Sequence, residues 1–205
     1  CHAAGFDGVE LHGAHSYLIC QFLGHKTNRR EDEWGGSFQG RARFLFAIIE
    51  AIRARTPPDF LVFVRISPLI EKMGIYLEDS LRLAQDLARA NVDGLHISCW
   101  DVFQNVDDED ERLMTKRFAD ALPADFPLIS TGGMWSAKDA QFVLEEGAHL
   151  VGVGRAAIGH PNWAVHLGDE SYDPQRPPFS AEHLAGAGLS PVFIDYMRRW
   201  KNFVV

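Results

Sequence analysis

The sequence has few cysteines, and they are widely spaced. Only three of its 205 residues are cysteine, at Cys1, Cys20 and Cys99. This spacing fits neither a disulfide framework nor the paired cysteines of a zinc or iron–sulfur site. We therefore expect reduced thiols in a reducing compartment, the cytoplasm, and no metal site.

Long apolar runs and an excess of positive charge are also missing. No run of about 18 apolar residues occurs, so we expect no membrane span. Acidic residues outnumber basic ones by 28 to 20, for a net charge of −8. Because nucleic-acid binding normally needs a basic face, we expect no nucleic-acid partner.

The first residues lack a signal-peptide pattern and an initiator methionine. The stretch CHAAG instead resembles the end of a helix, with Gly5 at its C-cap. We therefore expect the chain to be part of a longer protein.

What the sequence does contain is an alternation of strand and helix patterns. With 46% apolar and 23% charged residues, it has a globular composition, and we expect one domain over residues 1–205. The alternation predicts an α/β fold with a parallel sheet, either a barrel or an open doubly wound sheet. The patterns predict strands at 6–11, 60–66, 94–98, 127–131 and 150–153, helices at 41–55, 77–90, 118–122, 136–146 and 193–203, and a surface loop at 168–191.

A pair of histidines and a tyrosine directly follow the first predicted strand. His12, His15 and Tyr17 stand where a barrel places its catalytic groups, at the carboxyl end of a strand. Two imidazole N–H groups could polarise one substrate oxygen, and the tyrosine could donate a proton. A purely structural pair is the alternative, and a zinc site is disfavoured because no third ligand stands at a typical spacing. His96 alternates with apolar neighbours, and a hydrogen-bonded core histidine is its simplest interpretation.

Arg65 stands near the carboxyl end of a strongly apolar strand. A charge in such a place is rarely buried without a partner. It could stabilise negative charge on a bound group, or form an ordinary ion pair with a carboxylate of a nearby loop.

Two glycine turns follow the last two predicted strands. They contain Gly132 and Gly133, and then Gly154 and Arg155. Loops after the last two strands of a barrel commonly bind phosphate through backbone N–H groups, and an arginine adds a forked donor. The pair of turns favours a phosphorylated ligand, with purely structural turns as the alternative.

Together these motifs resemble the Old Yellow Enzyme family of FMN oxidoreductases. The resemblance covers nearly all of residues 4–167, and the motifs come in the family's order. Two stretches depart from the family pattern, at Gly24–Lys26 and Gln39–Gly40. The matching segments are AGFDGVELHGAHSYL at 4–18, NRREDEWGGS at 28–37, RARF at 41–44, the strand with Arg65, Gly132-Gly133, and GVGR at 152–155.

The resemblance implies a (β/α)₈ TIM barrel, of which this chain would hold strands four to eight and a C-terminal helix. It implies that His12 and His15 bind the substrate's activating oxygen and that Tyr17 is the proton donor. Arg65 would contact the flavin ring. The FMN phosphate would be held by Gly133, Gly154 and Arg155, and Gly132 would also belong to the cofactor site. NADH or NADPH would supply hydride, and the substrate would be a small activated alkene such as an enone.

Two other functions stay open at this point. Relatives on the same fold include amine dehydrogenases, which carry a cysteine cluster that this sequence lacks. The chain could also be a catalytically silent fragment. Five parallel strands leave two open edges, so we expect a homo-oligomer or association with the missing N-terminal half.

Overall fold

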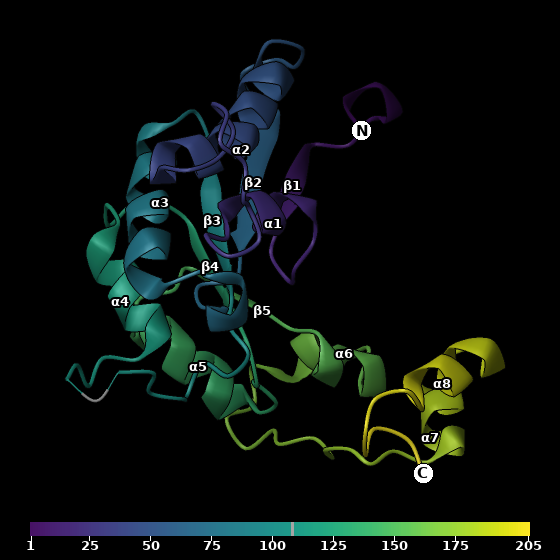
Figure 1. Ribbon diagram of the computed structural model, residues 1–205. Helices are drawn as coiled ribbons and strands as arrows, with labels where there is room; N and C mark the ends of the chain where they lie inside the picture. The colour runs from purple at the N-terminus through teal and green to yellow at the C-terminus, as the bar shows by residue number, and fades with distance from the viewer. Residues whose placement is uncertain (108) are drawn as a thin grey trace.

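The computed structural model describes residues 1–107 and 109–205. Its centre is a five-stranded parallel sheet in the order β1-β2-β3-β4-β5 (Figure 1). Strands that are consecutive in the sequence are also neighbours in the sheet. This order results when every connection between strands crosses over with the same handedness. The strands are β1 (Gly8–Gly13), β2 (Leu61–Ile66), β3 (Gly94–Ser98), β4 (Leu128–Thr131) and β5 (Leu150–Gly152).

Helices connect the strands and continue beyond the sheet. Most of the predicted helices are present, with shifted ends. The helices are α1 (Leu18–Leu23), α2 (Phe38–Arg53), α3 (Leu77–Arg89), α4 (Met114–Ala121), α5 (Ala137–Glu145), α6 (Arg155–Gly159), α7 (Ala181–Gly186) and α8 (Pro191–Met197). Short 3₁₀ turns occur at His2–Ala4, Glu71–Met73 and Trp163–His166.

The sheet has one apolar face and one polar face. Alternate residues of β3 show this: Leu95 and Ile97 are fully buried in the main core, whereas His96 and Ser98 project to the other side. Helices α2, α3 and α4 pack on the apolar face (Figure 1). Burial of this face supplies the main hydrophobic stabilisation. The opposite face is left for polar groups.

Strand register aligns the polar residues in neighbouring rows. His12 of β1 pairs with Arg65 of β2, and Arg65 pairs with His96 of β3. Ser98 pairs with Thr131 of β4. Because all five strands are parallel, their carboxyl ends meet at one edge, and the loops that carry the motifs meet there too.

The C-terminal part corrects two predictions. The stretch 168–191 is not all loop, because Ser180 caps α7 and Leu184 of that helix is fully buried. The last helix ends at Met197 rather than continuing to residue 203. Beyond it, the backbone of Phe203 accepts a hydrogen bond from Phe179 N at 2.9 Å, which replaces a further helical turn.

The same region forms a second core. Its buried side chains include both helical and loop residues, and α7 and α8 lie side by side near the C-terminus (Figure 1). The cluster contains Trp135, Ala140, Ala156, Trp163, Phe179, Leu184, Ile194, Met197 and Phe203. Trp135 and Ala140 tie this core to the segment after β4, so the C-terminal segment is held against the loops at the strand ends.

Within the part of the chain that the structure describes, β1 and β5 each pair on one side only. The sheet is therefore open along both edges, as predicted. Among the same residues, no helix is both long and apolar enough to cross a membrane.

Candidate functional site

The loop after β1 brings His12, His15 and Tyr17 together. The two imidazole centroids are 5.1 Å apart, and the Tyr17 ring lies 5.1 Å from that of His12. The chain turns sharply because His15 and Ser16 both adopt positive φ, at 55° and 66°. Such conformations are uncommon for residues other than glycine, and they cluster at functional sites.

A hydrogen-bonded chain links this loop to the next two strands. Arg65 Nη2 lies 2.9 Å from Ser98 Oγ, and Ser98 Oγ lies 2.7 Å from His15 Nε2. His15 N also donates to Ser67 Oγ at 3.0 Å. The turn is therefore anchored by side chains from β3 and from the segment after β2. Sequence reasoning missed Ser67 and Ser98, since no spacing pattern marks them.

The surroundings of this corner lower the pKa values of both histidines and so favour their neutral forms. Although much of His15 is exposed, partial burial of the ring is the main cause that lowers its pKa, and the charge of Arg65 lowers it further. The same two causes, in the same order, lower the pKa of His12. A neutral imidazole still offers one N–H group to a substrate oxygen.

Glycines shape the turn after β4. A Cβ on Gly132 would lie 2.5 Å from the backbone oxygen of Cys99, closer than real contacts permit. Gly133 has a φ of +74°, which side chains disfavour. These two residues therefore have a backbone reason to be glycine, and the turn exposes main-chain groups to the adjoining cleft.

A cleft of about 690 Å³ lies at the carboxyl ends of the strands. Six of the predicted site residues line it, namely His15, Arg65, Gly132, Gly133, Gly154 and Arg155. His12 and Tyr17 do not line it, but they adjoin it through their ring contacts in the β1 loop. The structure therefore brings the predicted residues to one place.

Aromatic residues of the C-terminal segment form a further wall of this cleft. Phe193 and Tyr196 stack with their planes 9° apart, and both line the cleft together with Trp200. On another side, Arg155 lies with its guanidinium carbon 6.0 Å from the centroid of the Trp100 ring. No sequence pattern indicated this wall, because the apolar stripe over 193–203 predicts a helix but not the surface against which it packs.

A separate polar network lies deeper on the same face. His96 Nδ1 is 2.7 Å from Glu10 Oε2, and His96 Nε2 is 2.6 Å from Thr131 Oγ1. His96 is 8% exposed and both ring nitrogens are paired, as a hydrogen-bonded core histidine requires. The hydrogen bond from His96 is the main cause that lowers the pKa of Glu10.

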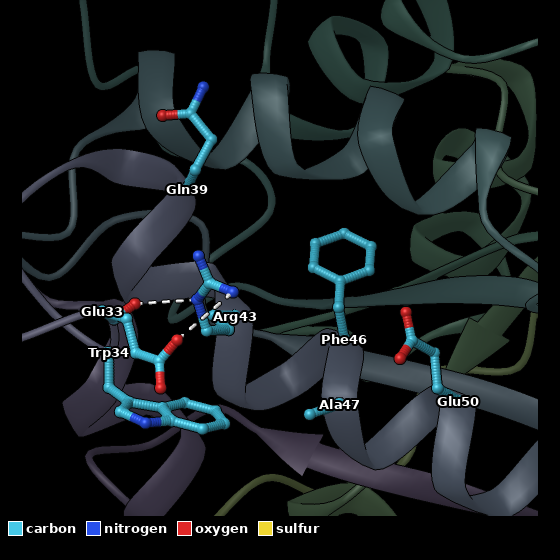
Figure 2. Close-up of a pocket in the computed structure, with 7 residues that line it drawn as sticks. All are labelled: Glu33, Trp34, Gln39, Arg43, Phe46, Ala47 and Glu50. Carbon is cyan, nitrogen blue, oxygen red and sulfur yellow. Dashed lines mark hydrogen bonds and ion pairs between the residues drawn. The ribbon is translucent and has the colours of Figure 1, made fainter.

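A second hollow, of about 380 Å³, lies beside α2. Figure 2 shows its sides, where Arg43 contacts Glu33 close to the Trp34 ring. None of the predicted site residues lines it, so the larger cleft is the candidate site. Within the described ranges 1–107 and 109–205, no group of three or more His, Cys, Asp or Glu side chains could hold a metal ion.

Comparisons with known proteins agree with this geometry. Residues 1–173 match the model of the NADH:flavin oxidoreductase / NADH oxidase family. The chain is 38% identical over 174 residues to NADH:fumarate oxidoreductase of Klebsiella pneumoniae (strain 342), an alignment that covers 80% of this chain and 19% of that protein. It is 39% identical over 175 residues to a probable NADH-dependent flavin oxidoreductase, YqiG, of Bacillus subtilis (strain 168), covering 80% of this chain and 46% of the relative.

The fold has solved counterparts as well. The structure of morphinone reductase in complex with tetrahydroNAD matches with a TM-score of 0.67 and 28% identity. The match covers 86% of this chain and 47% of that one. The chain thus spans less than half the length of these relatives, and its five parallel strands are part of a (β/α)₈ barrel. It belongs to the NADH:flavin oxidoreductase / NADH oxidase family, the family of Old Yellow Enzyme.

Proposed function

We propose that this chain carries the FMN- and substrate-binding part of an NAD(P)H-dependent oxidoreductase that reduces the activated C=C bond of enones or similar alkenes. One observation carries the proposal: the glycine turns, Arg65 and His15 line a single cleft. Family membership and the names of the relatives support the oxidoreductase class.

The cleft suits FMN in three respects. Its size, about 690 Å³, is in the usual range for a small-molecule or cofactor site. The Nε atom of Arg65 is buried and has no hydrogen-bond partner among the described residues, so it suits an acceptor on a flavin ring. Arg155 makes no ion pair among those residues and stands beside the glycine turns, where it suits a phosphate.

The chain's own residues supply binding and the proton. His12 and His15 donate hydrogen bonds to the carbonyl oxygen of an enone and polarise it. Their lowered pKa values favour the neutral rings. Tyr17 donates a proton to the α-carbon, acting as general acid. FMN held by Arg65, the glycine turns and Arg155 would supply the hydride chemistry at the β-carbon of the alkene, with NAD(P)H as the hydride source. Hydride and proton together saturate the C=C bond.

Rapid mixing of the flavin-loaded protein tests these roles, because reduction by NADH and reoxidation by an enone are observed separately. We expect Tyr17→Phe to slow reoxidation of the flavin by the enone about 10²-fold or more, which is the typical loss in rate when a general acid is removed. Reduction of the flavin by NADH should be unchanged. Tyr76→Phe is the matched control, since Tyr76 precedes α3 and its ring contacts Lys26, whereas the Tyr17 ring contacts His12. Equal slowing of both steps, or turnover of amines but not of enones, would refute the proposal.

The two open edges of the sheet indicate that another polypeptide segment pairs with them. Because β1 and β5 each pair on one side only among the described residues, we propose that the preceding strands of a longer protein, or a second copy of the chain, cover them. Size-exclusion chromatography with light scattering, on the chain alone and on the longer protein, tests this. A stable 23.0 kDa monomer of the chain alone would contradict it.

A further inference from the structure

Ser98 occupies a central place in the site although no motif marks it. It is the last residue of β3 and is 7% exposed. Its single hydroxyl group contacts both a permanent cation and an imidazole, at 2.9 Å from Arg65 Nη2 and 2.7 Å from His15 Nε2. These two contacts constrain where hydrogens can be.

The directions of the hydrogen bonds follow from the donor inventory. The Arg65 guanidinium has only donors, so Ser98 Oγ accepts from Nη2. Ser98 Oγ contacts no other acceptor among the described residues, so its one hydroxyl hydrogen is paired only if it donates to His15 Nε2, 2.7 Å away. The reverse arrangement, with an Nε2–H group donating to Ser98 Oγ, would leave the hydroxyl hydrogen of the 7% exposed Ser98 without a partner. When Nε2 accepts, the proton of a neutral imidazole is on Nδ1.

We propose that Ser98 is a positioning residue that fixes His15 as the neutral tautomer protonated on Nδ1. The hydrogen bond from Arg65 turns the Ser98 hydroxyl group so that its hydrogen points to His15 Nε2, which then accepts. His15 Nδ1 has no hydrogen-bond partner in the part of the chain that the structure describes, so its N–H remains available. On the proposed function, which this consequence rests on, that N–H is the donor to the substrate oxygen.

The environment of His15 supports a neutral ring. The charged and titratable groups that face it are Arg65 from β2, His12 from β1 and His96 from β3. All three disfavour a second positive charge there, in addition to partial burial. The backbone of His15 is held separately, through Ser67 Oγ, so loss of the Ser98 hydroxyl should change the tautomer without releasing the turn.

Histidine NMR measures the tautomer directly. The full chain, labelled with ¹⁵N-histidine, is examined at pH 8, and the His15 signals are identified by their absence in His15→Gln. We expect the Nδ1–H pattern in the wild type and in Ser98→Thr, which keeps the hydroxyl. Ser98→Ala should move the population to the Nε2–H form that free histidine favours. Ser130→Ala is the matched control, because Ser130 is a buried strand serine whose hydroxyl group bonds Thr115 and, among residues 1–107 and 109–205, no group of the site.

An Nε2–H pattern in the wild type overturns the proposal by itself, even if Ser98→Ala fails to fold. An unchanged tautomer in a folded Ser98→Ala protein overturns it as well. The kinetic readout is separate: in Ser98→Ala we expect kcat/KM for an enone to fall about tenfold, as for one lost hydrogen bond, and flavin reduction by NADH to fall by a smaller factor. A protein that shows the predicted tautomers but reduces no enone refutes the proposed function and leaves the role of Ser98 intact.

Discussion

Replacing Gly152 by alanine should destabilise the protein strongly, because β4 and β5 approach each other closely at this residue. A Cβ on Gly152 would lie 1.8 Å from Thr131 Oγ1 and 3.1 Å from His96 Nε2. Thr131 cannot turn away freely, since its Oγ1 is bonded to His96 Nε2 at 2.6 Å. Losing that bond leaves a buried imidazole nitrogen unpaired, at a cost of about 1–3 kcal/mol. Overpacking itself costs about 1–3 kcal/mol.

We therefore expect Gly152→Ala to lower the free energy of unfolding by about 2–6 kcal/mol, a large part of the total of a typical domain. Urea denaturation followed by circular dichroism measures it. Gly186→Ala is the control: the space there is open, so it should unfold at the same or a slightly higher urea concentration. In a Thr131→Ala background the clash with Oγ1 is gone, and Gly152→Ala should cost much less. An equal cost in both backgrounds would refute the reasoning.

Three further predictions concern pH, the bonds of a buried arginine and a helix cap. Because burial and Arg65 lower the pKa values of His12 and His15, the unfolded chain takes up protons first as pH falls through about 6.5. Stability should fall from pH 7.5 to 5.5, and less so in the His12→Asn/His15→Asn variant; urea midpoints that fall equally would contradict this. Arg41 has a buried side chain that bonds Asp79 and two backbone oxygens, so Arg41→Met should cost about 2–3 kcal/mol in urea unfolding, and a loss below about 0.5 kcal/mol would count against these bonds. Ser136 forms a capping box at the start of α5; Ser136→Ala should cost about 1 kcal/mol, and an unchanged melting temperature would argue against the cap.

The sheet was predictable from the sequence because its signals are local. Each strand was predicted to within two residues of its bounds. The strand at 94–98 was placed without error, since buried Leu95 and Ile97 alternate with polar residues. The relative position of the motifs followed from topology alone, because parallel strands end at one edge.

The errors came from tertiary contacts that a periodic pattern does not show. The apolar stripe after residue 193 predicted one helix to 203. The chain leaves the helix after Met197, Asn202 adopts a φ of +60°, and the backbone of Phe203 pairs with Phe179. The contact between Ser98 and His15 could not be predicted from the sequence either. It depends on the positive φ of His15, and a histidine in the sequence does not indicate such a backbone conformation.

The central claim, that this cleft holds FMN, is tested most directly by flavin retention. The 205-residue chain is mixed with excess FMN, unbound flavin is removed, and the visible absorption spectrum is recorded for the wild type and for Arg155→Ala. The account predicts a flavin band near one equivalent in the wild type. It predicts a dissociation constant raised about 10- to 100-fold in the variant, as for one charge-assisted hydrogen bond. A wild-type chain that folds and retains no flavin, or a variant that binds as tightly as the wild type, would contradict it.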